Sequence, residues 1–171
     1  MNTVLKGFAI ICVIVVVVGL IIPNDVDVRR SIEISATVEE IHQYTNDLEQ
    51  WPKWSPWITA DPSIKTTLGD IHSGIGASQS WIGASGSGQL RLTGSSLDSG
   101  IIYDMTFEGD PTVYQAGISY LSKGDSVTVT WYMTGQMKPI IVGNYFSLLM
   151  DTFVGDSFQQ GLEMLKEVVE K

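Results

Sequence analysis

The segment SVTVTWYMTGQMKPIIVGNYFSLLMDTFVGDSFQQGLEMLKEVVEK (126–171) changes its hydrophobic period once, and this change indicates the fold class. From Ser126 to Gly135 apolar side chains occupy every second position, as in a strand that buries one face. From Val142 to Lys171 they recur at steps of three and four residues, which predicts one long helix over the sheet. The chain is therefore expected to have an α+β fold.

Further alternating segments precede this strand, and Gly, Asp and Pro residues separate them. The predicted strands cover residues 26–34, 64–68, 77–83, 89–95, 101–108 and 112–121. From the third strand on, turns of a few residues connect them, which favours antiparallel pairing because a parallel connection needs a longer crossover. After the first strand, Thr37 and Glu40 have the spacing of a capping box, so a short helix is expected there. The segment WPKWSPW (51–57) follows, and its two prolines prevent a long regular helix.

The N-terminal segment is strongly apolar, with no charge from Phe8 to Ile22. Residues 1–23 are predicted to form a transmembrane anchor, and residues 24–171 one domain. A cleaved signal peptide and a buried core helix are the alternatives. The residues before Pro23 make a poor cleavage site, and such density of Val and Ile suits lipid. The protein is thus predicted to be single-pass, with its domain on the extracytoplasmic side.

Charge and composition exclude several classes of function. The net charge is -9, from 10 basic and 19 acidic residues, so a nucleic-acid partner is not expected. With Cys12 as its single cysteine the chain can form no internal disulfide. His42 and His72 stand apart in the sequence among scattered carboxylates, so neither a metal site nor a cofactor is predicted. No catalytic residue is assigned, because the inward positions of the strands carry no Asp, Glu, His or Lys.

Four segments in this order resemble a known superfamily: RSIEISATVEEIHQYTNDLEQWPKWSPW, GIGASQSWIG, SVTVTWYMTGQM and DSFQQGLEMLKEVVE. The chain from Val26 to Lys171 resembles the START-like superfamily, also called SRPBCC, in its polyketide cyclase/dehydrase-like bacterial branch. That resemblance implies a helix-grip fold, in which a seven-stranded curved antiparallel sheet wraps around the long C-terminal helix. It also implies a cavity that binds lipids, sterols, polyketides or similar apolar molecules.

Bulky side chains at inward positions are the predicted lining of that cavity. They are Trp81, Tyr103, Phe107, Tyr114, Tyr120, Trp131, Met133, Met150 and Phe153. Trp51, Trp54 and Trp57 are expected to pack in the core, or else to form a lid or a membrane-facing patch.

Three functions follow as hypotheses from this interpretation of the sequence. The first is a membrane-anchored carrier or sensor that holds a hydrophobic small molecule. The second is a cyclase or dehydratase in which a tyrosine such as Tyr103 or Tyr120 donates a proton. The third is a membrane-anchored interaction module with a closed cavity.

Overall fold

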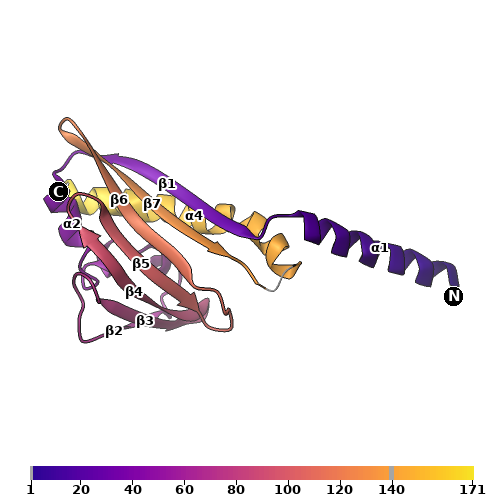
Figure 1. Cartoon of the computed structure of the whole chain (residues 1–171). Helices are drawn as coiled ribbons and strands as arrows, with labels where there is room; N and C mark the ends of the chain where they lie inside the picture. Colours follow the sequence, from indigo (N-terminus) through magenta and orange to yellow (C-terminus); the bar gives the residue numbers. More distant parts are fainter. Residues whose placement is uncertain (1, 139–140) are drawn as a thin grey trace.

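A computed structural model shows a curved antiparallel sheet that packs against a long helix (Figure 1). It describes residues 2–138 and 141–171. The strands are β1 (Asp25–Ile34), β2 (Lys65–Leu68), β3 (Ser78–Gly83), β4 (Gly86–Ser96), β5 (Gly100–Phe107), β6 (Tyr114–Lys123) and β7 (Ser126–Gln136). The helices are α1 (Asn2–Ile21), α2 (Val38–Thr45), α3 (Pro56–Ala60) and α4 (Val142–Val169), with a 3₁₀ turn at Trp51–Lys53.

The seven strands form one sheet in the order β1-β7-β6-β5-β4-β3-β2, and every neighbouring pair is antiparallel. The meander from β3 to β7 follows the short turns predicted from the sequence, and a longer connection joins β2 to β3. β1 closes the order by pairing with β7 over its whole length, from Asp25 opposite Gln136 to Ile34 opposite Val127. The predicted helix-grip architecture, with seven antiparallel strands and a long C-terminal helix, is confirmed.

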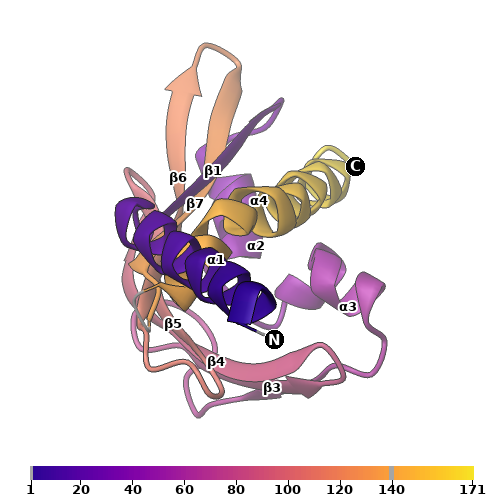
Figure 2. The ribbon, with the colours of Figure 1, turned by 90° about the vertical axis from the view of Figure 1, so that its right-hand side faces the viewer.

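α4 crosses the concave face of the sheet, and the end-on view shows the sheet bending around it (Figure 2). Phe158, Leu162 and Leu165 lie on the buried side of this helix. They share one buried cluster with alternate residues of β7, including Val129 and Trp131, which face inward because a strand alternates its side chains. The core therefore lies between one face of the sheet and one stripe of α4.

The helix predicted before the Trp-rich segment is α2, and its capping box is present. The Thr37 hydroxyl accepts from the Glu40 N–H at 3.2 Å, and the Glu40 carboxylate accepts from the Thr37 N–H at 2.8 Å. These bonds satisfy backbone donors at the start of the helix. The Glu40 carboxylate also accepts from the Thr37 hydroxyl at 2.9 Å, and its bonds from the Thr37 N–H and hydroxyl hold its pKa below the usual value.

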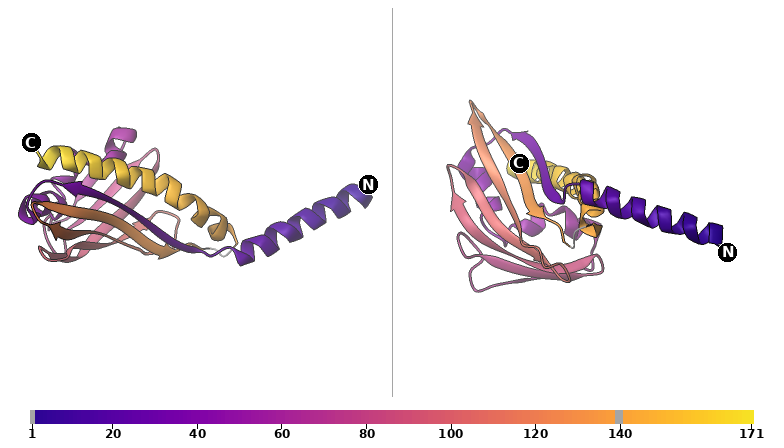
Figure 3. Two further views of the ribbon diagram at one scale, coloured as in Figure 1. Left: turned by 90° about the horizontal axis from the view of Figure 1, so that it is seen from above. Right: turned by 45° about the vertical axis from the view of Figure 1, so that its right-hand side comes forward.

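α1 extends away from the sheet and meets the remainder of the structure at its C-terminal end, beside the start of α4 (Figure 3). Asn144 of α4 makes this junction and is only 4% exposed. Its amide donates to the Gly19 carbonyl at 2.7 Å and to the Ile22 carbonyl at 2.6 Å. Because the last carbonyls of a helix have no partner within it, Asn144 acts as a cap supplied by another element.

The prediction of a transmembrane anchor at residues 1–23 is not supported. Within the described residues, every helix falls short of the length and apolar character that crossing a membrane requires. The uncharged stretch of α1 after Lys6, from Gly7 to Ile21, is about 22 Å long at about 1.5 Å per residue. A bilayer core is about 30 Å thick. This finding also contradicts the single-pass topology and the extracytoplasmic position that were inferred from the anchor.

Candidate functional site

A pocket of about 250 Å³ lies between the sheet, α4 and the segment that carries α3. Its walls come from elements far apart in the sequence, which the bent sheet brings together. They are formed by Trp51, Pro52, Ser55, Trp57, Ile58, Ile64, Thr66, Gln79, Trp81, Ser85, Gly86, Leu90, Tyr103, Met105, Phe107, Met133, Val154 and Phe158. Aliphatic and aromatic side chains predominate, so the pocket suits an apolar molecule.

The Trp-rich segment forms one wall because its indoles are fixed by backbone carbonyls of α2. Trp51 donates its indole N–H to the Thr45 carbonyl at 2.9 Å, and Trp54 donates to the Tyr44 carbonyl at 3.2 Å. The rings of Trp51 and Trp54 pack against each other with centroids 5.2 Å apart. Trp54 is fully buried, whereas Trp51 and Trp57 present part of their surface to the pocket. This segment therefore packs in the core and lines the pocket as well.

An aromatic cluster around Trp131 contributes two of its rings, Tyr103 and Phe158, to the pocket wall. The Trp131 ring stacks on Phe158 of α4, with centroids 4.4 Å apart and an interplanar angle of 4°. Trp131 donates its indole N–H to the Tyr103 hydroxyl oxygen at 2.8 Å. Burial raises the pKa of Tyr103 far above its ordinary value, so the hydroxyl keeps its proton at neutral pH.

A carboxylate clamp lies beside the pocket. Asp61 accepts hydrogen bonds from the backbone N–H groups of Ser63 and Ser85, both at 2.9 Å, and from both hydroxyls. These bonds hold the pKa of Asp61 well below its usual range. The clamp links the end of α3 to the β3–β4 turn, and Ser85 of that turn lines the pocket.

Four of the nine side chains predicted to line the cavity lie in the wall of this pocket, namely Trp81, Tyr103, Phe107 and Met133. Trp131 is buried directly behind Tyr103. Tyr114, the first residue of β6, donates its hydroxyl hydrogen to Asp110 at 2.7 Å. Tyr120 belongs to a separate polar network. Met150 packs against the edge of the core. Whether any of the nine binds a ligand stays a prediction.

The expected inward position of Phe153 is wrong. Its side chain is 69% exposed, while the next residue, Val154, lines the pocket. Each residue of an α-helix turns by about 100°, so a shift of one position moves a side chain off the buried stripe. Sequence reasoning also missed Phe158 as pocket lining, although it lies four residues beyond Val154 on the same stripe.

A second cluster of polar side chains lies away from the pocket, between α2, β4 and β6. His42 Nδ1 lies 3.1 Å from the Tyr120 hydroxyl, which also hydrogen-bonds Thr45. On its other side, His42 Nε2 lies 3.3 Å from the Ser95 hydroxyl. Burial lowers the pKa of His42 and raises that of Tyr120 to about 12. Both rings are thus uncharged at neutral pH and act as structural hydrogen-bonding groups.

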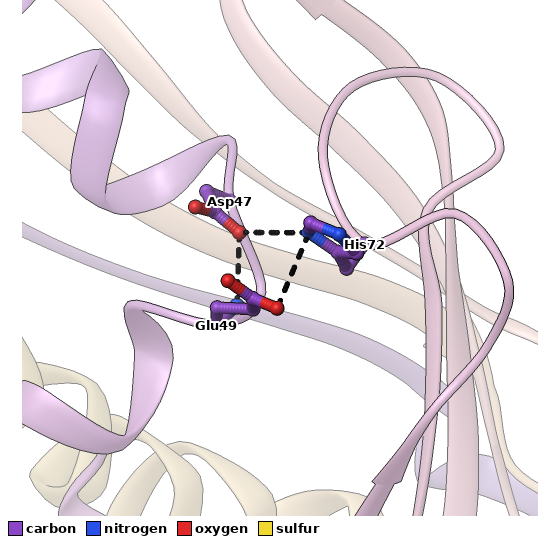
Figure 4. Close-up of side chains that lie close together, drawn as sticks. All are labelled: Asp47, Glu49 and His72. Atoms are coloured by element: carbon purple, nitrogen blue, oxygen red, sulfur yellow. Dashed lines mark hydrogen bonds and ion pairs between the residues drawn. The ribbon is translucent and has the colours of Figure 1, made fainter.

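Asp47, Glu49 and His72 form a third cluster (Figure 4). His72 Nδ1 lies 3.6 Å from a carboxylate oxygen of Asp47 and 3.7 Å from one of Glu49. The expectation that His72 and the scattered carboxylates form no cluster of possible ligands is wrong, because an antiparallel bridge between Asp47 and Ser73 joins the two loops. Imidazole and carboxylate are zinc ligands, and the described residues supply three of the four that a tetrahedral site needs. With a protonated imidazole, the same arrangement is an ion pair that holds the two loops together.

Solved structures of low sequence identity share this fold. The chain is similar to the di-domain ARO/CYC StfQ from the steffimycin biosynthetic pathway, with a TM-score of 0.67 and 10% identity over 85% of this chain and 51% of that one. It is similar to norcoclaurine synthase from Thalictrum, with a TM-score of 0.65 and 13% identity over 85% and 94% of the two chains. A protein from Thermobifida fusca gives a TM-score of 0.63 and 20% identity over 84% and 92%.

No curated protein matches the sequence significantly. A family model described as "Polyketide cyclase / dehydrase and lipid transport" matches residues 25–170, which cover the whole sheet and α4. Because this match spans most of the chain, the protein belongs to the polyketide cyclase/dehydrase and lipid transport family.

Proposed function

We propose that residues 24–171 form a domain that binds an apolar small molecule in the pocket between the sheet and α4, as a carrier or sensor. The observation that carries this proposal is the pocket itself, a hollow of about 250 Å³ with a mainly aromatic and aliphatic wall between the sheet and α4. Protein interiors are close-packed, so an open volume of this size is a feature that the side chains maintain. Its volume lies just below the range of about 300–1,000 Å³ typical of ligand pockets, which favours a compact occupant.

Binding is favoured over catalysis by the titratable groups around the pocket. Within the described residues, no Asp, Glu, His, Lys or Arg contributes to the lining. Among the described lining residues, Tyr103 carries the most acidic group, a phenol. Burial raises the pKa of this phenol, which makes it a weaker acid than an ordinary tyrosine. A cyclase or dehydratase that relies on general acid or base catalysis needs a group whose pKa lies closer to the working pH.

The first test is native mass spectrometry of the full chain purified from the cells that produce it, followed by extraction and identification of any bound molecule. We expect one apolar molecule per chain. Where the protein is isolated empty, titration with the neutral probe N-phenyl-1-naphthylamine serves instead, and an increase of probe fluorescence with one-to-one stoichiometry is expected.

Two variants of α4 show whether the pocket is the site. Val154→Trp adds an indole to the pocket wall and should abolish binding, because the open volume is filled. Val142→Trp makes the same change at an exposed position of the same helix outside the pocket, and should leave binding unchanged. Equal binding by both variants, or a native chain that is empty and takes up no probe, would refute the proposed function.

A further inference from the structure

The hydroxyl of Tyr103 has a hydrogen that no described residue accepts. Tyr103 is 1% exposed and lines the pocket. Its oxygen accepts the Trp131 indole N–H at 2.8 Å, and this is the one hydrogen bond of the hydroxyl among the described residues. An indole N–H can only donate, so the phenol is forced to act as the acceptor in that pair and its own hydrogen stays unused.

Burial makes this unused donor significant. A polar group taken out of water without a partner costs about 1–3 kcal/mol, so buried donors are rarely left unpaired. The partner must therefore come from the contents of the pocket. The neighbouring wall carries a second hydroxyl, that of Ser55, a residue that is 7% exposed and precedes α3 without making a side-chain capping bond.

The charge of the pocket restricts the occupant. Over the described residues, the lining has no ionised side chain that could pair with a carboxylate, phosphate or ammonium group. Burying an unpaired charge is strongly unfavourable, so an ionised ligand would be excluded. The pocket thus combines an uncharged apolar wall with hydroxyl donors.

We propose that the ligand is an uncharged, compact, largely apolar molecule that bears a carbonyl or similar acceptor oxygen, and that Tyr103 donates a hydrogen bond to this oxygen. The inference rests on the proposed function and adds to it the chemical group that is recognised. Tyr103 acts here as a specificity-determining residue. Because the Tyr103 oxygen accepts the Trp131 N–H, the direction in which the Tyr103 hydroxyl can donate is fixed.

The test compares fluorenone with fluorene, two neutral three-ring compounds. Fluorenone carries a carbonyl at the position where fluorene carries a methylene. Binding to the full chain is measured by quenching of tryptophan fluorescence, because Trp51, Trp57 and Trp81 line the pocket. We expect fluorenone to bind about 3- to 10-fold more tightly, as one net hydrogen bond provides. Tyr103→Phe should reduce this preference to about one and leave the affinity for fluorene unchanged.

Tyr120→Phe is the matched control, since it removes a buried hydroxyl that lies outside the pocket. It should keep the preference for fluorenone. Should Tyr103→Phe fail to fold because Trp131 loses its acceptor, infrared spectroscopy of fluorenone bound to the native chain gives an independent readout. Its carbonyl stretch should lie at a lower wavenumber than in cyclohexane, because a hydrogen bond weakens the C=O bond.

The outcomes separate the two proposals. Binding of both compounds with equal affinity, an unshifted carbonyl stretch, or a preference that survives in Tyr103→Phe would overturn the role of Tyr103 and leave the apolar pocket standing. Failure of both compounds to bind the native chain would count against the proposed function itself.

Discussion

Replacement of Phe158 by alanine tests whether this side chain belongs both to the buried core and to the pocket wall. Phe158 is 1% exposed, stacks on Trp131 at 4.4 Å and meets the Trp57 ring edge-on at 6.2 Å. The side chain also lines the pocket. Its removal therefore takes away core contacts and enlarges the pocket in a single step.

The expected loss of stability is large. A buried Phe→Ala change costs about 3–5 kcal/mol, from lost transfer free energy and from the cavity left behind. The lower end applies if Trp131 moves into the vacated space, and the upper end if the stacked ring stays in place. A domain of this size is stable by about 5–15 kcal/mol, so about a fifth of the total or more is at stake. The melting temperature should fall by about 6–20 °C.

Urea denaturation of the full chain, followed by tryptophan fluorescence and circular dichroism, gives the free energy of unfolding. The control is Phe153→Ala, five positions earlier on the same helix, where the ring is 69% exposed. An exposed position should change stability by less than about 0.5 kcal/mol. A loss below about 1 kcal/mol at Phe158, or equal losses at both positions, would refute the assignment of the buried stripe of α4.

Three further predictions concern the frame around the site. Gly100→Ala should destabilise by at least about 2 kcal/mol in urea denaturation, since its φ is +91° and a Cβ would lie 1.8 Å from a carbonyl oxygen of β6; Gly109→Ala, at φ +83° with open space around it, should cost only about 1 kcal/mol. Asn144→Ala should speed amide hydrogen exchange at the C-terminal end of α1 and leave the C-terminal half of α4 unchanged, whereas equal protection in variant and native chain would contradict the capping role. Because the pKa of His42 is lowered in the folded state, its contribution to stability is complete above its unfolded pKa of about 6.5 and is lost as pH falls below that value. His42→Gln should therefore show a smaller drop in urea midpoint between pH 7.5 and pH 5.5 than the native chain, and equal drops would contradict this.

The strands could be predicted because their chemistry is local. Alternation marks one face of β7 through Val127, Val129, Trp131 and Met133, and all four are buried. Short turns determine which strands are neighbours, so the order of the meander followed from the sequence as well. The pairing of β1 with β7 joins the two ends of the domain and was implied only by the family resemblance.

The pocket was harder to predict than the sheet, because its walls depend on relations that local pattern does not encode. The alternation of side chains along a strand shows that Tyr114 and Trp131 face inward. Both are nevertheless covered by neighbouring groups and lie outside the pocket wall. The positions of Trp51 and Trp54 depend on backbone carbonyls of α2, which two prolines and a 3₁₀ turn bring within reach. His72 meets Asp47 through a bridge between loops that no periodicity predicts.

Gly88 explains how the large indole ring of Trp81 can line the pocket without filling it. Trp81 pairs with Gly88 on the next strand, and a Cβ at Gly88 would lie 2.3 Å from the indole ring. The ring therefore lies across the neighbouring strand, where it meets Phe107 edge-on at 5.8 Å. A side chain at that position would push the indole away from the sheet and into the open volume. The size of the pocket thus depends on the lack of a side chain at Gly88, beneath Trp81, as well as on the rings that form the wall.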